Sequence, residues 1–123
     1  MKIAIVGSRK YPAMTEVWAF VNELPKDTIV ISGGASGVDS VAEDTAASLG
    51  LRTLIFPVAK NGLPPYPHGK AEFRKRAMAR NKLIVEMADE VHAFWDGESN
   101  GTRDTIEWAK KLGKPCTVHL CDE

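Results

Sequence analysis

Apolar residues along this chain gather into short runs, and each run stops at glycine, proline or a polar residue. The runs are KIAIVGS (2–8), TIVISGG (28–34), RTLIFP (52–57), EVHAFWDG (90–97) and KPCTVHL (114–120). Their length and β-branched content are typical of buried parallel strands. Between them, apolar positions recur at helical spacing in 13–24, 38–49, 70–88 and 101–112. This alternation predicts a three-layer α/β sandwich of about five parallel strands with helices on both faces.

The composition predicts one globular domain, 1–123. The chain has 123 residues, of which 44% are hydrophobic and 26% charged, as in a folded soluble protein. Its 16 basic and 16 acidic residues cancel, so the net charge does not indicate attraction to nucleic acid or to an anionic membrane. No apolar run reaches the ~18 residues of a membrane span, and the first one is too short for a signal peptide. We therefore expect a cytoplasmic protein with no membrane contact.

Cysteines and histidines give no sign of a metal site. Cys116 and Cys121 are the only cysteines, and we interpret them as packing thiols of a reduced protein, with a disulfide or a metal role as the alternative. His92 and His119 alternate within strands and are interpreted as packing residues. No cluster has metal-ligand spacing, so no metal is expected. The irregular segment 57–70 is rich in proline and glycine, and is either functional or a surface loop of no consequence.

Three strands are predicted to end in turns rich in glycine or hydroxyl groups. The turns are Gly7-Ser8-Arg9, Gly33-Gly34-Ala35-Ser36-Gly37 and Gly97-Glu98-Ser99-Asn100-Gly101-Thr102. Ligands of open parallel sheets bind beyond the carboxyl ends of the strands, and helix starts offer free N–H groups to anions. The turns therefore predict a phosphate-binding crevice. The structural alternative is turn formation alone, with Ser36 and Asp39 as a capping box. The first turn lacks G-x-G-x-x-G, which disfavours an ordinary NAD enzyme.

The segment 70–88 carries an arginine within its apolar stripe. At 100° per residue the stripe consists of Phe73, Ala77, Ile84 and Met87, with Arg80 in its middle and Asn81 at its edge. A buried guanidinium needs an anion, and either a ligand phosphate or a carboxylate of the fold suits Arg80. Asp39 and Asp96 lie near the crevice, where they bind hydroxyl groups or cap turns. His68, a lone histidine in the irregular segment, is a weaker candidate.

Four motifs occur in order along nearly the whole chain: IVGSR, ISGGASGVD, HGKAEFRKRAMARN and WDGESNGTRDTIEWAKKLGKP. Together they resemble the SLOG superfamily, and within it the small YspA-type, cpYpsA-related proteins. The resemblance implies a Rossmann-like fold and a nucleotide site at the strand ends. Its relatives include LOG-type phosphoribohydrolases, DNA-processing protein A and sensor domains for nucleotide-derived ligands.

The resemblance also implies site residues. Phosphoribohydrolases carry a glutamate where this chain has Thr105, and a threonine cannot replace a carboxylate at an oxocarbenium-like centre. No catalytic residue is assigned; the candidates are Arg80, Asp104 and Glu98, and Asp39 is a further candidate source of the missing carboxylate. The expected ligand-binding residues are Gly7, Ser8, Arg9, Gly33, Gly34, Ser36, Gly37, Asp39, His68, Arg80, Asn81, Gly97, Ser99, Asn100, Gly101 and Thr102.

Three functions are compatible with these residues. The first expectation is a sensor or binding module for a nucleotide-derived small molecule, with no cofactor. The first alternative is an N-glycosidase acting on nucleoside 5′-monophosphates, and the second is single-stranded nucleic-acid binding through the basic segment 70–82. Nucleic acid is not the expected partner, because the chain is neutral and few aromatics lie among its basic residues. By analogy with relatives we also expect a homo-oligomer, a dimer or higher.

Overall fold

Strands and helices alternate along the chain as predicted. The computed structural model describes residues 1–58 and 70–120, with the side chains of 70–73 left out. The elements are β1 (Lys2–Gly7), α1 (Met14–Asn22), β2 (Ile29–Ser32), α2 (Val38–Ser48), β3 (Arg52–Ile55), α3 (Lys70–Met87), β4 (Glu90–Trp95), α4 (Asn100–Lys111) and β5 (Cys116–Leu120). Each lies within a few residues of its predicted bounds. His68, Cys121 and most of the irregular segment fall outside the described residues.

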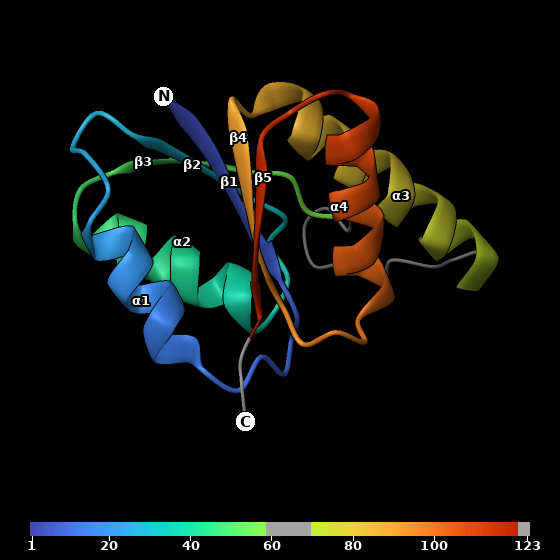
Figure 1. Cartoon of the computed structure of the whole chain (residues 1–123), viewed down its shortest axis with the longest axis horizontal. Coiled ribbons are helices and arrows are strands. Elements are labelled where there is room, and N and C mark those ends of the chain that lie inside the picture. Colours follow the sequence, from blue (N-terminus) through green and yellow to red (C-terminus); the bar gives the residue numbers. More distant parts are fainter. Residues whose placement is uncertain (59–69, 121–123) are drawn as a thin grey trace.

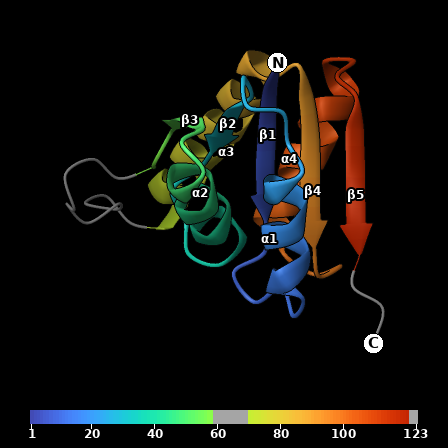
Figure 2. The ribbon, with the colours of Figure 1, turned by 90° about the vertical axis from the view of Figure 1, so that its left-hand side faces the viewer.

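The five strands form one parallel sheet in the order β3-β2-β1-β4-β5. Figure 2 shows β1, β4 and β5 side by side and pointing the same way. The chain starts in the centre, winds outward to β3 and then returns to the other side of β1. As a result, the neighbouring strands β1 and β4 are followed by helices on opposite faces, which makes a topological switch point. The carboxyl ends of β1, β2 and β4 meet there.

Two apolar layers hold the helices to the sheet. Helices α1 and α2 cover one face, and α3 and α4 cover the other (Figure 1). Alternate residues of β1 supply the two layers, because successive strand side chains point to opposite faces. Ile3 and Ile5 pack with Val17 and Val21 of α1, whereas Ala4 and Val6 join the layer below α3 and α4. The predicted α/β sandwich is therefore confirmed.

Helix α3 departs from its prediction in the phase of its buried face. Asn81, Ile84, Val85 and Ala88 are buried, whereas Met87 is 36% exposed. Their spacing is that of one helical face, and Asn81 rather than Arg80 lies on it. Arg80 is half-buried at the flank of that face. The buried face of α3 is therefore centred one position further along than the sequence pattern predicted, because the polar residue Asn81 is part of it.

Two smaller expectations concern Cys116 and the membrane. Cys116 is a free, half-buried thiol, and burial raises its pKa, as suits a packing residue. In the described ranges, no helix combines the length and the apolar character that crossing a bilayer requires.

Candidate functional site

A cavity of about 390 Å³ opens at the switch point, where the carboxyl ends of β1, β2 and β4 meet. Nine expected site residues line it: Gly7, Arg9, Gly33, Asp39, Arg80, Asn81, Ser99, Gly101 and Thr102. The structure thus places the three predicted turns and Arg80 around a single space. Lys10, Ala35 and Thr105 also line it. Lys10 was not singled out from the sequence, although its position directly after Arg9 could have indicated it.

Several expected residues do not line the cavity: Ser8, Gly34, Ser36, Gly37, Gly97 and Asn100. Ser8 is buried, and its Oγ accepts a hydrogen bond from the Asp96 N–H at 3.1 Å. Ser36 is exposed, and α2 begins after Gly37 with no side-chain cap. The proposed capping box is therefore absent.

Gly37 shows what one of the glycines does. Its φ is +82°, and a Cβ atom there would lie 2.5 Å from the carbonyl oxygen of Arg9. This glycine allows the β1–α1 turn to pack against the start of α2. At Gly37 the structural alternative therefore holds, because the fold itself requires a glycine there.

Arg80 is anchored by neutral oxygens. Its Nη1 donates to the carbonyls of Gly33 at 2.6 Å and Phe56 at 3.3 Å, and its Nε donates to Asn81 Oδ1 at 2.9 Å. The predicted direct partner, an anion, is thus not the main anchor among the described residues. Burial lowers the pKa of Arg80, whereas the nearby charge of Asp39 raises it. Hydrogen bonds to three oxygens therefore fix the guanidinium at the cavity wall, and the Asp39 carboxylate stabilises its positive charge.

Asp39 brings a carboxylate into the same cavity. It is 5% exposed, and its Oδ2 accepts a hydrogen bond from the Ala35 N–H at 3.2 Å. Burial is the largest influence on this group and raises its pKa from 3.8 to about 6, although the Ala35 bond and the Arg80 charge oppose the shift. A buried acid with a pKa close to neutral therefore lies beside Arg80.

The other acids near the cavity have structural partners. Asp96 Oδ1 accepts the N–H groups of Ser99 at 2.8 Å and Glu98 at 2.9 Å, and these bonds lower its pKa. Asp96 is thus a turn cap, as the alternative interpretation had it. Asp104 Oδ2 accepts from Asn81 Nδ2 at 3.0 Å, which ties α4 to α3. Glu98 is exposed.

The hydrolase alternative requires a carboxylate at the cavity. Neither Asp104 nor Glu98 lines the cavity. Thr105 is buried and donates from Oγ1 to the Gly101 carbonyl at 3.1 Å, as a helix-bound hydroxyl does. Among the described residues, the acids that line the cavity are Asp39 and Asp96.

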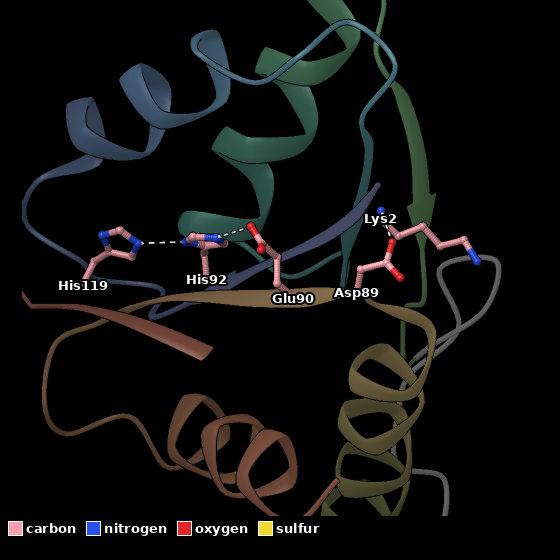
Figure 3. Close-up of polar contacts among 5 residues, drawn as sticks. All are labelled: Lys2, Asp89, Glu90, His92 and His119. Carbon is pink, nitrogen blue, oxygen red and sulfur yellow. Dashed lines mark hydrogen bonds and ion pairs between the residues drawn. The ribbon is translucent and has the colours of Figure 1, made fainter. Parts of the chain in front are cut away.

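A second polar cluster lies on the face covered by α1. His92 bridges His119, at 3.2 Å between Nδ1 and Nε2, and Glu90, at 3.0 Å between Nε2 and Oε1 (Figure 3). Phe20 packs on His92 with ring centroids 4.4 Å apart, and Phe94 stacks on His119 at 4.2 Å. Both histidines are thus packing residues, as predicted, and they also form a chain of hydrogen bonds.

Comparison with known proteins finds relatives that are named for DNA processing. The family model described as DNA recombination-mediator protein A matches residues 1–65. A Mycobacterium tuberculosis protein named for DNA processing, DprA, is 28% identical over 134 residues, covering 90% of this chain and 34% of its own. The Gene 61 protein of Mycobacterium phage D29 is 34% identical over 121 residues, covering 93% of this chain and 92% of its own.

Solved structures agree on the fold. DNA processing protein A from Streptococcus pneumoniae superposes with a TM-score of 0.76 at 20% identity, covering 95% of this chain and 49% of that one. The protein from Helicobacter pylori superposes with a TM-score of 0.72 at 25% identity, covering all of this chain and 66% of that one. The latter structure is described as showing a single-stranded DNA binding mode.

The sheet order and the cavity at its switch point define a Rossmann-like protein, and the predicted relation to the SLOG superfamily is confirmed. Within that class, the chain belongs to the DNA recombination-mediator protein A family, because the family model matches residues 1–65, more than half of the chain. It spans about a third of the length of the M. tuberculosis relative.

The family overturns two expectations from the sequence. It was wrong to expect a nucleotide-derived small molecule as the main ligand, and wrong not to expect nucleic acid as a partner, because the relatives are DNA-processing proteins.

The net charge was a poor guide to the partner because the basic and acidic residues are unevenly distributed over the helices. Helices α1 and α2 together carry Glu16, Asp39, Glu43 and Asp44 and no basic residue, whereas α3 and α4 carry nine basic and four acidic residues. The basic ones are Lys70, Arg74, Lys75, Arg76, Arg80, Lys82, Arg103, Lys110 and Lys111.

Proposed function

We propose that this chain binds single-stranded nucleic acid as one domain, with backbone phosphate entering the cavity at the switch point. The observation that carries the proposal is the convergence of Arg9, Lys10 and Arg80 on one cavity. The start of α4, at Ser99, Gly101 and Thr102, lines the same space. Phosphate contacts of this kind supply the sequence-independent part of nucleic-acid affinity.

The size of the cavity favours a single strand. About 390 Å³ suits one small ligand group, and a flexible strand can turn one phosphate inward where a stiff duplex cannot. No aromatic ring is among the lining residues that the structure describes. Base stacking inside the cavity is therefore not available, and we expect weak sequence preference. The single-stranded DNA binding described for the H. pylori relative supports this choice of ligand.

The face formed by α3 and α4 offers a path for the rest of the strand. The two helices lie side by side, as Figure 1 shows. Lys82 and Lys111 lie over the ring of Trp108, at 5.3 Å and 5.0 Å from its centroid. Arg103 lies over Trp95 at 5.5 Å. Basic groups interleaved with aromatic rings are the usual combination on surfaces that track single strands.

Fluorescence anisotropy with labelled oligothymidylate and a matched duplex, over a range of salt concentrations, tests the proposal. We expect the single strand to bind more tightly than the duplex, with log K falling steeply against log salt, by about 0.7 per phosphate contact. Arg9→Gln and Lys10→Gln should each weaken binding and make this slope shallower by about 0.7. Lys26→Gln, in the α1–β2 turn at the opposite edge of the sheet, is the matched control and should change neither. Affinity that ignores salt, or Arg9 and Lys10 variants that bind like the wild type, would refute the proposal.

A further inference from the structure

An acid inside a site proposed for phosphate is unexpected, and Asp39 is such an acid. It lies in the first turn of α2, lines the cavity and is buried. The surroundings of Gly33 show that the Asp39 carboxylate lies near the Arg80 guanidinium. A Cβ atom built on Gly33 would lie 2.7 Å from Arg80 Nη1 and 2.9 Å from Asp39 Oδ2. Both charged groups thus meet at the same point of the β2–α2 turn.

Groups of both signs surround this carboxylate. Arg80 of α3 faces it, and Arg9 and Lys10 of the β1–α1 turn and Asp96 of the β4–α4 turn line the same cavity. Glu43, one turn further along α2, adds repulsion, although its Oε2 already accepts bonds from Ser32 Oγ at 2.6 Å and the Gly34 N–H at 3.1 Å. The Ala35 N–H donates a hydrogen bond to the Asp39 carboxylate, and the Gly33 backbone also lowers the pKa of this group.

We propose that Asp39 is an internal competitor for the anion, and that a nucleic-acid phosphate enters the cavity together with one proton taken up by Asp39. The inference rests on the proposed function and deepens it. An ionised carboxylate already stands in the field of Arg80. A phosphodiester would place a second negative charge beside a carboxylate that is only 5% exposed, and like charges repel strongly where they are buried.

Protonation removes that conflict. One proton passes from solvent to a carboxylate oxygen of Asp39, and no covalent bond in the strand changes. Of the two acidic groups beside Arg80, the phosphate is then the one that carries a negative charge. In the folded protein without bound phosphate, the pKa of Asp39 is about 6, near enough to neutral for Asp39 to take up a proton. Bound phosphate raises that pKa further, so by linkage the affinity must increase as the pH falls.

The experiment measures proton uptake directly. Wild-type protein is titrated with oligothymidylate, whose bases do not titrate in this range, from pH 5.5 to 8.5 at constant ionic strength. Calorimetry in two buffers of different ionisation enthalpy then gives the number of protons taken up per strand bound. We expect a value between zero and one that rises above pH 6, and a Kd that increases by up to about tenfold per pH unit, the limit for one linked proton.

Asp39→Asn separates this role from a general effect of pH. The amide keeps an acceptor oxygen for Ala35 and removes the charge, so the variant should bind at least as tightly as the wild type at pH 7.5 and show no proton uptake from this site. Asp44→Asn, an exposed acid of the same helix, is the control and should retain the wild-type pH profile. Thermal unfolding checks that both variants are folded.

The outcomes are distinct. Strong binding by wild type and Asp39→Asn with identical pH profiles, or wild-type binding without proton uptake, overturns the role of Asp39 and leaves the proposed function standing. No binding by either protein at any pH, even at low salt, overturns the proposed function and the inference together.

Discussion

Asn81 of α3 donates a hydrogen bond from Nδ2 to the carboxylate of Asp104 in α4, over 3.0 Å. The same side chain accepts from Arg80 Nε at 2.9 Å, and it is only 5% exposed. One amide therefore joins the two helices of the basic face and orients the guanidinium at the cavity wall.

Asn81→Ala should destabilise the fold and loosen Arg80. The substitution leaves the Nε group of Arg80 and the Asp104 carboxylate without this partner, a loss of about 1–3 kcal/mol for buried polar groups. Urea unfolding measures the change in the free energy of unfolding. Asn100→Ala, an exposed position in the first turn of α4, should change it by less than about 0.5 kcal/mol. Equal effects at the two positions would contradict the role given to Asn81.

Gly33→Ala should disturb the site more than the fold. The added methyl group would lie 2.7 Å from Arg80 Nη1, so the guanidinium must move away from the Gly33 carbonyl. We expect overpacking to cost about 1–3 kcal/mol of stability. Single-strand affinity should also fall, because Arg80 is displaced from the cavity wall.

Gly101→Ala is the matched stability control for that substitution. A Cβ atom at Gly101 would have no neighbour within 4 Å, and alanine suits a helix better than glycine by about 0.5–1 kcal/mol. The free energy of unfolding should therefore rise or stay constant. A fall as large as that of Gly33→Ala would show that the steric interpretation is wrong.

Asp39 should make stability depend on pH in a direction unusual for an acid. Its pKa is about 6 in the fold against 3.8 for the free side chain, so ionisation destabilises the folded state above pH 6. The penalty disappears as the pH falls from about 6 towards 3.8. Two units correspond to at most about 3 kcal/mol. Asp39→Asn should therefore be more stable than the wild type at pH 7.5, and the difference should shrink towards pH 4. A variant that is less stable at pH 7.5 would contradict this account.

His119 should act in the opposite direction. Burial and then the neighbouring His92 lower the pKa of His119 below its ordinary 6.5. The fold thus favours the neutral ring, and this stabilisation is present above pH 6.5 and is lost as the pH falls through that value. Urea unfolding of the wild type and His119→Gln between pH 7.5 and 5.5 isolates the contribution. The difference between the two proteins should narrow on acidification, and a constant difference would rule the role out.

Lys82 and Lys111 should matter only for longer strands. Both lie over Trp108, and neither lines the cavity. Their joint replacement by glutamine should make the salt slope of a long oligothymidylate shallower by roughly 1.4, or two phosphate contacts. Binding of an oligonucleotide just long enough for the cavity should be unchanged. A loss that is the same for short and long strands would argue against a path along α3 and α4.

The sheet could be predicted because each strand is a short run rich in β-branched residues that ends at a glycine, a proline or a polar residue, as in Ile29–Ser32. The turns around the cavity could be predicted for a related reason: parallel strands bring their carboxyl ends to one edge, so Gly33 and Gly101 had to lie near each other. The buried face of α3 could not be predicted correctly, because a pattern of apolar residues does not reveal that the polar residue Asn81 is buried.

Two features of the site depend on contacts that the sequence does not encode locally. Arg80 reaches the Gly33 carbonyl across 47 positions of sequence, and its nearness to Asp39 follows from the crossing of α3 beside the end of β2. The partner class was missed because a net charge is a sum, whereas binding depends on where the charges lie. Helices α1 and α2 carry four acidic and no basic residues, whereas α3 and α4 carry nine basic and four acidic ones, so a chain of zero net charge has a basic surplus on one layer of helices.

The most direct test of the central claim is to map amide chemical shifts by NMR while oligothymidylate is added to the isotopically labelled protein. The account predicts that the largest shifts fall on Arg9, Lys10, Ala35, Gly101 and Thr102, around the cavity. Shifts concentrated at the opposite edge of the sheet, around Lys26 and Gly50, or no shifts at all at low salt, would contradict it.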